Sequence, residues 1–193
     1  MTQLADQTLD ELTLNETARP KAPPVPGARG HPRKMGGQLA AIHAGYLHQI
    51  ARVAAVLERI EAGDAPPEHL HQIVLSLDMA ENFRAFGSLC GQQCSILKMH
   101  HDIEQASMFP RLEEAGGGIF AAIVAKLRDE HEVVHELLVR LERAAMALMY
   151  DQTDENFAQA AETFHKLEEV LRSHFGYEET ELAEAIGYYL GRV

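Results

Sequence analysis

Two histidines four residues apart, His131 and His135 in the stretch HEVVH, have the residue type and spacing of a pair of metal ligands. In an α-helix, side chains four residues apart lie one turn apart on the same face, so both imidazoles can reach one ion. No serine or cysteine nucleophile accompanies them in a recognisable motif. The chemistry to examine is therefore metal binding, and other donors must be placed relative to this pair.

A glycine triplet at residues 116–118 predicts a helix break upstream of HEVVH. An antiparallel hairpin folded about its centre places His135 opposite His100 and His131 opposite Glu104. His100 and Glu104 have an H-x3-E spacing, which places a nitrogen donor and a carboxylate on one helical face. The hairpin therefore brings four possible ligands to one level of the fold.

A second break, predicted at residues 151–154, places His131 opposite His174 on the last helix, with Glu178 about one turn further along. His174 and Glu178 repeat the H-x3-E spacing. A third instance of the spacing begins at His165, but this residue is about half a turn out of phase with His174 and is predicted to lie on the surface. Two independent loops therefore converge on one cluster.

The first long helix adds His43, which occupies a core position on an apolar face together with Tyr46, one turn away. His48 lies off that face and is assigned to solvent. The phenol of Tyr46 either packs in the core with a hydrogen-bond partner or points towards a metal ion. His100 and His174 also continue apolar faces, where ionisable groups are costly unless something such as a metal ion satisfies them.

These donors require an all-α fold, and the apolar residues of the chain follow a helical period nearly throughout. Residues 1–36 contain five of the eight prolines without sustained periodicity, which predicts a disordered leader. Residues 37–193 are predicted to form an up-down-up-down four-helix bundle. Folding the chain about residue 65, between the first two long helices, does not bring His43 level with His100, because too many residues lie between them. An extra short helix or kink is therefore expected over residues 68–80. The four main helices are expected at residues 38–62, 81–109 and 119–150 and from residue 155 onwards.

The net charge of −12 and the isoelectric point near 5.3 argue against nucleic acid or an anionic membrane as a partner, because both require a basic face. The sequence shows no targeting or membrane-spanning segment, and a cytoplasmic location is expected. Cys90 and Cys94 lie four apart on a predicted helix, a geometry that does not suit a disulfide. They are expected to be small core residues.

The cluster predicted at one level of the bundle contains five imidazoles and two carboxylates. Structural zinc usually takes four ligands, whereas a two-metal site with bridging carboxylates suits this larger number. Nitrogen and oxygen donors in this mixture favour iron, and manganese less so. The predicted metal ligands are His43, His100, Glu104, His131, His135, His174 and Glu178.

The order H…HxxxE…HxxxH…HxxxE resembles the hemerythrin-like, HHE cation-binding family, with HHDIE at residues 100–104 and HFGYE at residues 174–178 similar to its signature segments. The resemblance covers about residues 38–190 and implies a carboxylate-bridged pair of non-haem iron ions. It implies that His131, His135 and His174 hold one iron, that His43 and His100 hold the other, and that Glu104 and Glu178 bridge them. His101, offset by about 100° from its neighbour, is expected to play an outer role around the site.

The resemblance implies an open position on the second iron for a small molecule, namely O2, hydrogen peroxide or nitric oxide. Hemerythrin itself has H-x4-D on its last helix, and the H-x3-E at His174 argues against simple reversible oxygen carriage. A peroxide-decomposing, catalase-like enzyme with Tyr46 on the open side is the favoured interpretation. The alternatives are a module that senses or stores iron, oxygen or nitric oxide without turnover, and a bundle whose buried histidines bind nothing.

Overall fold

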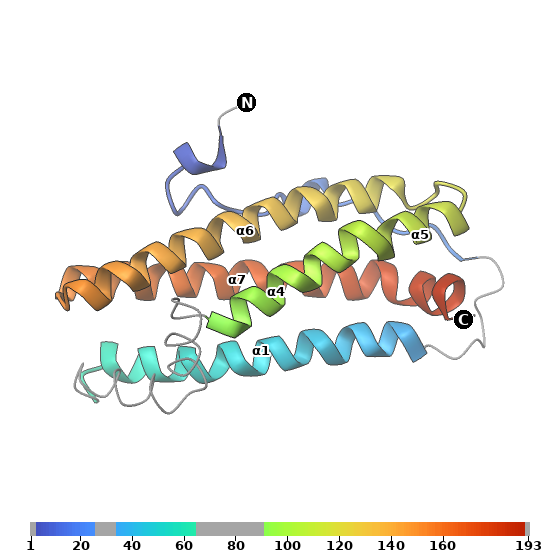
Figure 1. Cartoon of the computed structure of the whole chain (residues 1–193). Coiled ribbons are helices and arrows are strands. Elements are labelled where there is room, and N and C mark those ends of the chain that lie inside the picture. Colours follow the sequence, from blue (N-terminus) through green and yellow to red (C-terminus); the bar gives the residue numbers. More distant parts are fainter. Residues whose placement is uncertain (1–2, 26–33, 65–90, 192–193) are drawn as a thin grey trace.

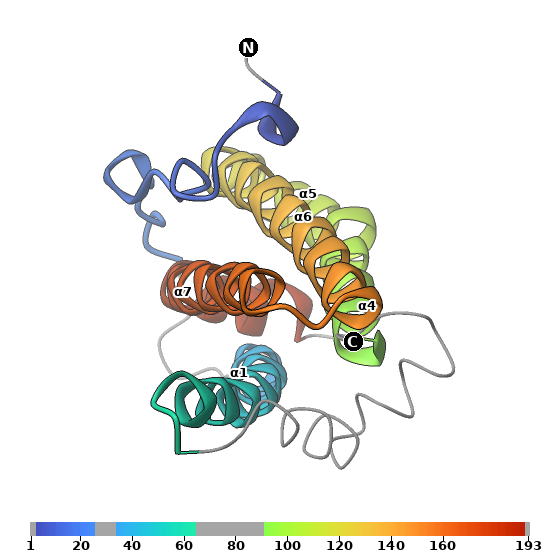
Figure 2. The ribbon, with the colours of Figure 1, turned by 90° about the vertical axis from the view of Figure 1, so that its left-hand side faces the viewer.

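The computed structural model describes residues 3–25, 34–64 and 91–191, which contain helices and no strand (Figure 1). Four long helical segments run roughly along one axis, as the all-α prediction requires. Figure 2 views the molecule from one end and shows α7 lying between α1 and α6, with the α4–α5 segment beside α6. The segments are α1 (Lys34–Glu61), α4 (Gly91–Ile103) with its continuation α5 (Phe109–Ala115), α6 (Ala121–Tyr150) and α7 (Asp154–Ala185).

The helix ends follow the predicted turn chemistry. Gly63, Gly117 and Gly118 have positive φ angles of 73°, 62° and 82°, which favour glycine because it has no Cβ. At the start of α7, the side chain of Thr153 accepts a hydrogen bond from the backbone N–H of Asn156 at 3.2 Å. The predicted breaks after α1, before α6 and before α7 are confirmed.

The second segment continues past Pro110, where the sequence predicted that it would weaken and end. A π-helical stretch, η3 (Glu104–Met108), links α4 to α5, and the N–H of Phe109 donates to the carbonyl of Glu104. This wider turn accommodates the residue that lacks an N–H, so that the helix reaches Ala115. The π-helical turn begins at one of the predicted metal ligands.

The core consists of two apolar clusters separated by a polar layer. The first cluster includes Leu57, Leu97, Leu141 and Leu171, and the second includes Phe109, Phe120, Leu127, Leu182 and Ile186. Burial of these side chains on four helical segments supplies the main stabilisation of the bundle. Ten buried polar or charged residues are found in the described part of the chain, and most of them lie in the layer between the clusters.

The leader is ordered over residues 3–25 and lies along α6 and α7 (Figures 1 and 2), in contrast to the disorder that its composition predicts. Leu12 is 1% exposed within the first apolar cluster, and Val25 is 9% exposed within the second. Two short 3-10 helices, Leu4–Asp6 and Glu16–Ala18, and a turn at residues 9–11 interrupt the segment. A few widely spaced buried apolar side chains are enough to hold the leader against the bundle. They produce no periodic pattern in the sequence from which this packing could be predicted.

Several predictions fall on residues that the structure does not describe. These are the extra helix or kink at residues 68–80, the first part of the second long helix, the leader beyond Val25 and Cys90. Within the described ranges, no helix is both long enough and apolar enough to cross a membrane.

Candidate metal centre

Two adjacent groups of donor atoms lie in the polar layer. Within each group the possible ligand atoms are all within 4.8 Å of one another, and every residue is buried. We call them the three-histidine group, which consists of His101, His131 and His174, and the mixed group, which consists of His43, His100, Glu104 and Glu178.

In the three-histidine group, the Nε2 atoms of all three rings are buried and have no hydrogen-bond partner. The Nδ1 atoms are engaged instead. His174 Nδ1 lies 3.1 Å from a carboxylate oxygen of Glu130, and His101 Nδ1 lies 3.3 Å from Nε2 of His135. A partner that accepts a hydrogen bond from Nδ1–H leaves the Nε2 lone pair free, as metal-binding histidines require.

The side-chain amide of Gln105 contacts His131, with its nitrogen Nε2 3.2 Å from Nδ1 of the ring. The oxygen and nitrogen of such an amide exchange places by a half-turn, so its orientation follows from the hydrogen-bonding network. With the amide oxygen towards the ring, His131 donates from Nδ1 and keeps its Nε2 lone pair. All three rings can then present Nε2 to one cation.

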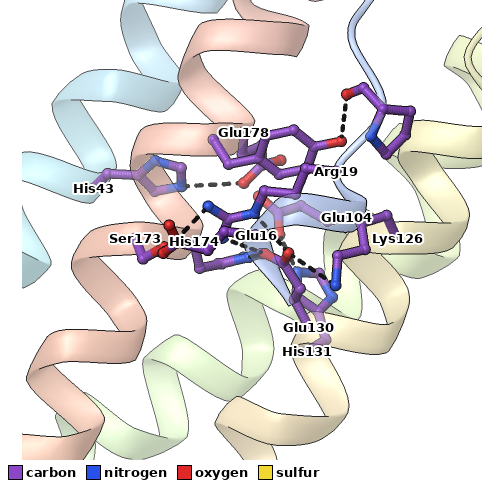
Figure 3. A network of polar contacts seen from close by, with 12 residues as sticks. Glu16, Arg19, His43, Glu104, Lys126, Glu130, His131, Ser173, His174 and Glu178 are labelled. Atoms are coloured by element: carbon purple, nitrogen blue, oxygen red, sulfur yellow. Dashed lines mark hydrogen bonds and ion pairs between the residues drawn. The ribbon is translucent and has the colours of Figure 1, made fainter. Parts of the chain in front are cut away.

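The mixed group has short contacts between its donors. His43 Nε2 lies 3.0 Å from His100 Nε2, and His100 Nε2 lies 2.9 Å from Oε1 of Glu104. His43 Nε2 also lies 3.6 Å from Oε2 of Glu178. Figure 3 marks this contact with a dashed line. All four carboxylate oxygens of the two glutamates are buried without a hydrogen-bond partner. Unpaired buried carboxylates are costly, and a cation at this position would satisfy them.

Glu104 connects the two groups. Its Oε2 lies 3.5 Å from Nε2 of His131, whereas its Oε1 faces His100. A carboxylate with one oxygen towards each group has the placement of a bridging ligand. It comes from the first residue of the π-helical turn, where the backbone departs from α-helical geometry.

Burial keeps the histidines neutral. It lowers the pKa of His43 to about 3, of His100 to about 4 and of His131 to about 2, and neighbouring imidazoles add to the effect for His43 and His131. The pKa values of His101 and His174 are lowered for the same principal reason. Neutral imidazole is the form that donates a lone pair to a metal ion.

The same burial acts in the opposite direction on the carboxylates. It raises the pKa of Glu104 to about 8 and raises that of Glu178 well above its usual value, with the nearby Glu104 charge adding to the shift of Glu178. These shifts apply to the metal-free protein. A bound cation favours the ionised form, so metal binding would displace protons from this pair.

Two glutamates outside the groups orient ligand histidines. Glu179 lies 3.0 Å from Nδ1 of His43. Glu130, on α6, contacts His174 and is itself bound by Arg19 of the leader at 2.9 and 3.0 Å (Figure 3). Burial alone would raise the pKa of Glu130, but the hydrogen bonds from His174 and Arg19, together with the charge of Arg19, outweigh it and hold the pKa at about 2. Neither glutamate was expected from the sequence, since neither belongs to a spaced pair of donors.

The structure brings six of the seven predicted ligands into the two groups. The exception is His135, which is half-buried and belongs to neither group. His101 occupies the position that was expected for His135. Its ring stacks on that of His131 with a centroid distance of 3.9 Å. The mirror about the glycine triplet placed His135 opposite His100, whereas in the structure Nε2 of His135 lies 3.3 Å from Nδ1 of His101.

His101 was given an outer role because it is about 100° away from His100 around the helix. An offset of this size excludes His101 from the helix face of His100 only if that face is narrow. A helix in a bundle has neighbours on two sides, so adjacent residues can point to different halves of a wide centre. The two histidines do this, with His100 contacting His43 and His101 contacting His131. The consecutive pair of histidines was the available signal.

The remaining predicted positions follow their expected environments. Tyr46 is half-buried, and its ring lies 5.5 Å from that of His100. Burial, followed by the charge of Glu104, raises the pKa of Tyr46, which keeps the phenol protonated. His48 is exposed, and His165 has a 37% exposed side chain near Glu61. His31 and the histidines at 69 and 71 lie outside the described residues.

Comparison with models of protein families identifies the family of this chain. The family model described as the hemerythrin HHE cation binding domain matches residues 37–186, which include all seven residues of the two groups. No curated protein and no solved structure matches the chain closely enough for comparison.

Proposed function

We propose a function for this chain from the premise that it belongs to the hemerythrin HHE cation-binding family, as the match over most of its length shows. The proposed function is that of a non-haem diiron protein that decomposes hydrogen peroxide. The observation that carries the proposal is the set of seven buried, unpaired nitrogen and oxygen atoms of the polar layer, which face one another from both groups. Iron suits this mixture of imidazole and carboxylate donors.

In this proposal, His101, His131 and His174 hold one ion and His43 and His100 hold the other, with Glu104 and Glu178 shared between them. The donor set is asymmetric, because one group offers three imidazoles and the other offers two. The ion with fewer protein ligands has room for a small molecule. Iron would supply the two-electron redox chemistry, and two molecules of hydrogen peroxide yield O2 and two molecules of water without any external reductant.

The surrounding residues prepare this side of the centre. Tyr46 lies next to His100 and carries a protonated phenol, which can donate a hydrogen bond to a bound small molecule. The apolar clusters on both sides of the layer exclude water from the ligands. The ring of Phe175 stacks on His43 with a centroid distance of 3.9 Å and restrains its orientation.

The test is metal analysis of the purified protein, combined with its visible spectrum before and after addition of O2 and peroxide. We expect about two iron ions per chain, as in two-metal sites with ions about 3.5–4 Å apart. Peroxide consumption should be catalytic and should exceed that of an equal concentration of free iron. One ion per chain after iron loading, or consumption equal to that of free iron, would contradict the diiron enzyme.

A second candidate is a sensing or storage module for iron, oxygen or nitric oxide without turnover. The observation that favours it is the chain of contacts from His174 through Glu130 to Arg19, which connects the centre to the leader. A protein that binds two iron ions and nitric oxide tightly but consumes no peroxide would support this candidate instead. A location in the cytoplasm remains part of both proposals.

A further inference from the structure

The leader crosses the polar layer from outside. Leu12 is anchored in one apolar cluster and Val25 in the other, so the intervening segment must pass over the level of the metal centre. Arg19 lies between these two anchors. Its side chain is only 12% exposed and points towards the bundle, where it meets the carboxylate of Glu130 (Figure 3).

The contact between Arg19 and Glu130 has the geometry of a two-pronged ion pair. Arg19 donates from Nε to Oε1 at 2.9 Å and from Nη2 to Oε2 at 3.0 Å. The planar guanidinium fixes the plane of the carboxylate as well as its position. Glu130 is 1% exposed, and the second cation near it among the described residues is Lys126, at 3.5 Å.

The same carboxylate orients a residue of the three-histidine group. Oε2 of Glu130 accepts from Nδ1 of the fully buried His174, whose unpaired Nε2 faces the other two histidines. An outer residue that holds a ligand histidine in this way sets both its tautomer and the direction of its lone pair. Arg19 therefore acts on the ligand through one intermediate side chain.

Neighbouring contacts hold the leader in register with this chain of residues. The hydroxyl of Tyr177 donates to the carbonyl of Pro20 at 2.9 Å, and the guanidinium of Arg19 lies 4.7 Å from the centre of the Tyr177 ring. The N–H of Ala22 donates to Glu181 at 2.6 Å. Glu16, beside Arg19, accepts from the hydroxyl of Ser173 on α7. Arg19 thus belongs to a docked segment, and its position depends on that docking.

We propose that Arg19 is a positioning residue of the metal centre, which couples docking of the leader to occupancy of the three-histidine group. The inference rests on metal binding at this group but does not depend on peroxide chemistry. Coupling of this kind is reciprocal, so a leader that strengthens metal binding is itself held more firmly when the metal is bound. How firmly the leader is docked on α6 and α7 therefore depends on whether the three-histidine group holds a metal ion.

The test uses zinc(II), a closed-shell probe ion, with the full-length protein and a competing chelator. Arg19→Gln should weaken zinc binding at the three-histidine group about three- to thirtyfold, the range expected for a residue that acts through another. The effect should be moderate because Lys126 still faces Glu130. Arg19→Lys, which keeps the charge but loses the fork, should give an intermediate affinity.

Two matched variants control for loss of charge and for loosening of the leader. Lys21→Gln removes a neighbouring leader cation, whose side chain is 86% exposed and pairs with Glu181. Arg140→Gln removes the donor to the carbonyls of Leu4 and Gln7 at the far end of the leader. Neither touches Glu130 or Arg19. Lys21 makes an exposed contact, and Arg140 contacts the end of the leader away from Arg19, so both variants should bind zinc within about twofold of the wild type.

The second readout is hydrogen exchange of the Ala22 amide, which is protected only while the leader is docked. Zinc should slow this exchange in the wild type, and Arg19→Gln should remove the zinc dependence. Exchange that is independent of zinc in the wild type, or unchanged zinc affinity in Arg19→Gln, would overturn the inference. Failure of the wild type to bind zinc would also overturn it. Failure of the iron-loaded protein to consume peroxide would affect only the proposed function.

Discussion

Nε2 of His43 lies 3.0 Å from Nε2 of His100, and both rings are neutral because burial lowers their pKa values. Only one of two facing nitrogens can carry a proton between them, so the contact satisfies one lone pair at most. A cation beside the pair would accept both lone pairs. Two carboxylates with no hydrogen-bond partner lie within the same group. The mixed group therefore has the lone pairs and the negative charge that a metal ion requires.

His101 and His135 both lie near His131, and their substitution should have different effects on metal binding. His101→Ala should lose one of the two ions, because it removes an unpaired Nε2 from the three-histidine group. His135→Ala should keep both ions. It should bind the ion at the three-histidine group about 10–100-fold less tightly, as expected when a residue that orients a ligand is lost. Metal content after dialysis and chelator competition measure both effects. Loss of an ion from His135→Ala alone would restore His135 as the ligand.

Substitution of a carboxylate should affect both ions. Glu178→Ala removes two buried oxygens that are proposed to be shared, and most of the bound metal should be lost. His48→Ala and His165→Ala are the matched controls, since these imidazoles lie outside the groups and reach solvent. Their metal content should equal that of the wild type. Retention of two ions in Glu178→Ala would contradict the bridging assignment.

Tyr46 distinguishes the enzyme from the binding module. Tyr46→Phe keeps the ring beside His100 but removes the hydroxyl that is proposed to face the open side. Both the peroxide rate and the visible spectrum of the iron-loaded protein should change, by about 10²–10⁴-fold in rate if the phenol takes part in proton transfer. Metal content should remain the same. An unaltered rate and spectrum would favour the sensing or storage candidate.

The stability of the metal-free protein should have its maximum near pH 6.5. The histidines have folded-state pKa values below 6.5, such as about 4 for His100, so the unfolded state binds more protons and stability falls as the pH drops below 6.5. Glu104 has a folded-state pKa of about 8, above its usual 4.5, so its contribution is lost as the pH rises from 4.5 to 8.

Between pH 4.5 and 6.5 the histidines outnumber Glu104 and Glu178, the carboxylates with raised pKa values, so stability increases with pH. Above pH 6.5 only these carboxylates change the stability, which then decreases. Thermal unfolding followed by circular dichroism, with a chelator present, measures the profile. Metal should remove the alkaline decline because it stabilises ionised Glu104 and Glu178. A midpoint for the metal-free protein that is constant from pH 6.5 to 8 would show that these carboxylates are not shifted.

The leader should contribute measurably to stability. Leu12 is 1% exposed within the first apolar cluster, and Leu12→Ala should lower the free energy of unfolding by about 2–3 kcal/mol, at the lower end for a buried leucine because the segment can move inwards. Thr13→Ala, at an exposed position beside it, is the control and should change little. Urea unfolding compares the two. A Leu12→Ala protein as stable as the wild type would mean that the leader is not docked in solution.

Local patterns in the sequence were enough to predict α1, α6 and α7 and the faces on which His43, His100, His131 and His174 lie. Helical periodicity is a short-range property, because each residue's direction depends on the turn around it. The glycine and threonine signals at Gly117 and Thr153 identified the turns for the same reason. The level of the cluster along the bundle then followed from the lengths of the helices between turns.

The tertiary structure decided which of two nearby histidines faces the centre, and which leader residue supports it. Whether His101 or His135 faces the other histidines depends on how α4 and α6 are rotated and shifted against each other, which helix packing determines and no local pattern records. The contact between Arg19 and Glu130 joins residues separated by 111 positions. Its partners become neighbours only after α6, α7 and the leader have packed together, because side-chain contacts at such separation depend on the whole fold.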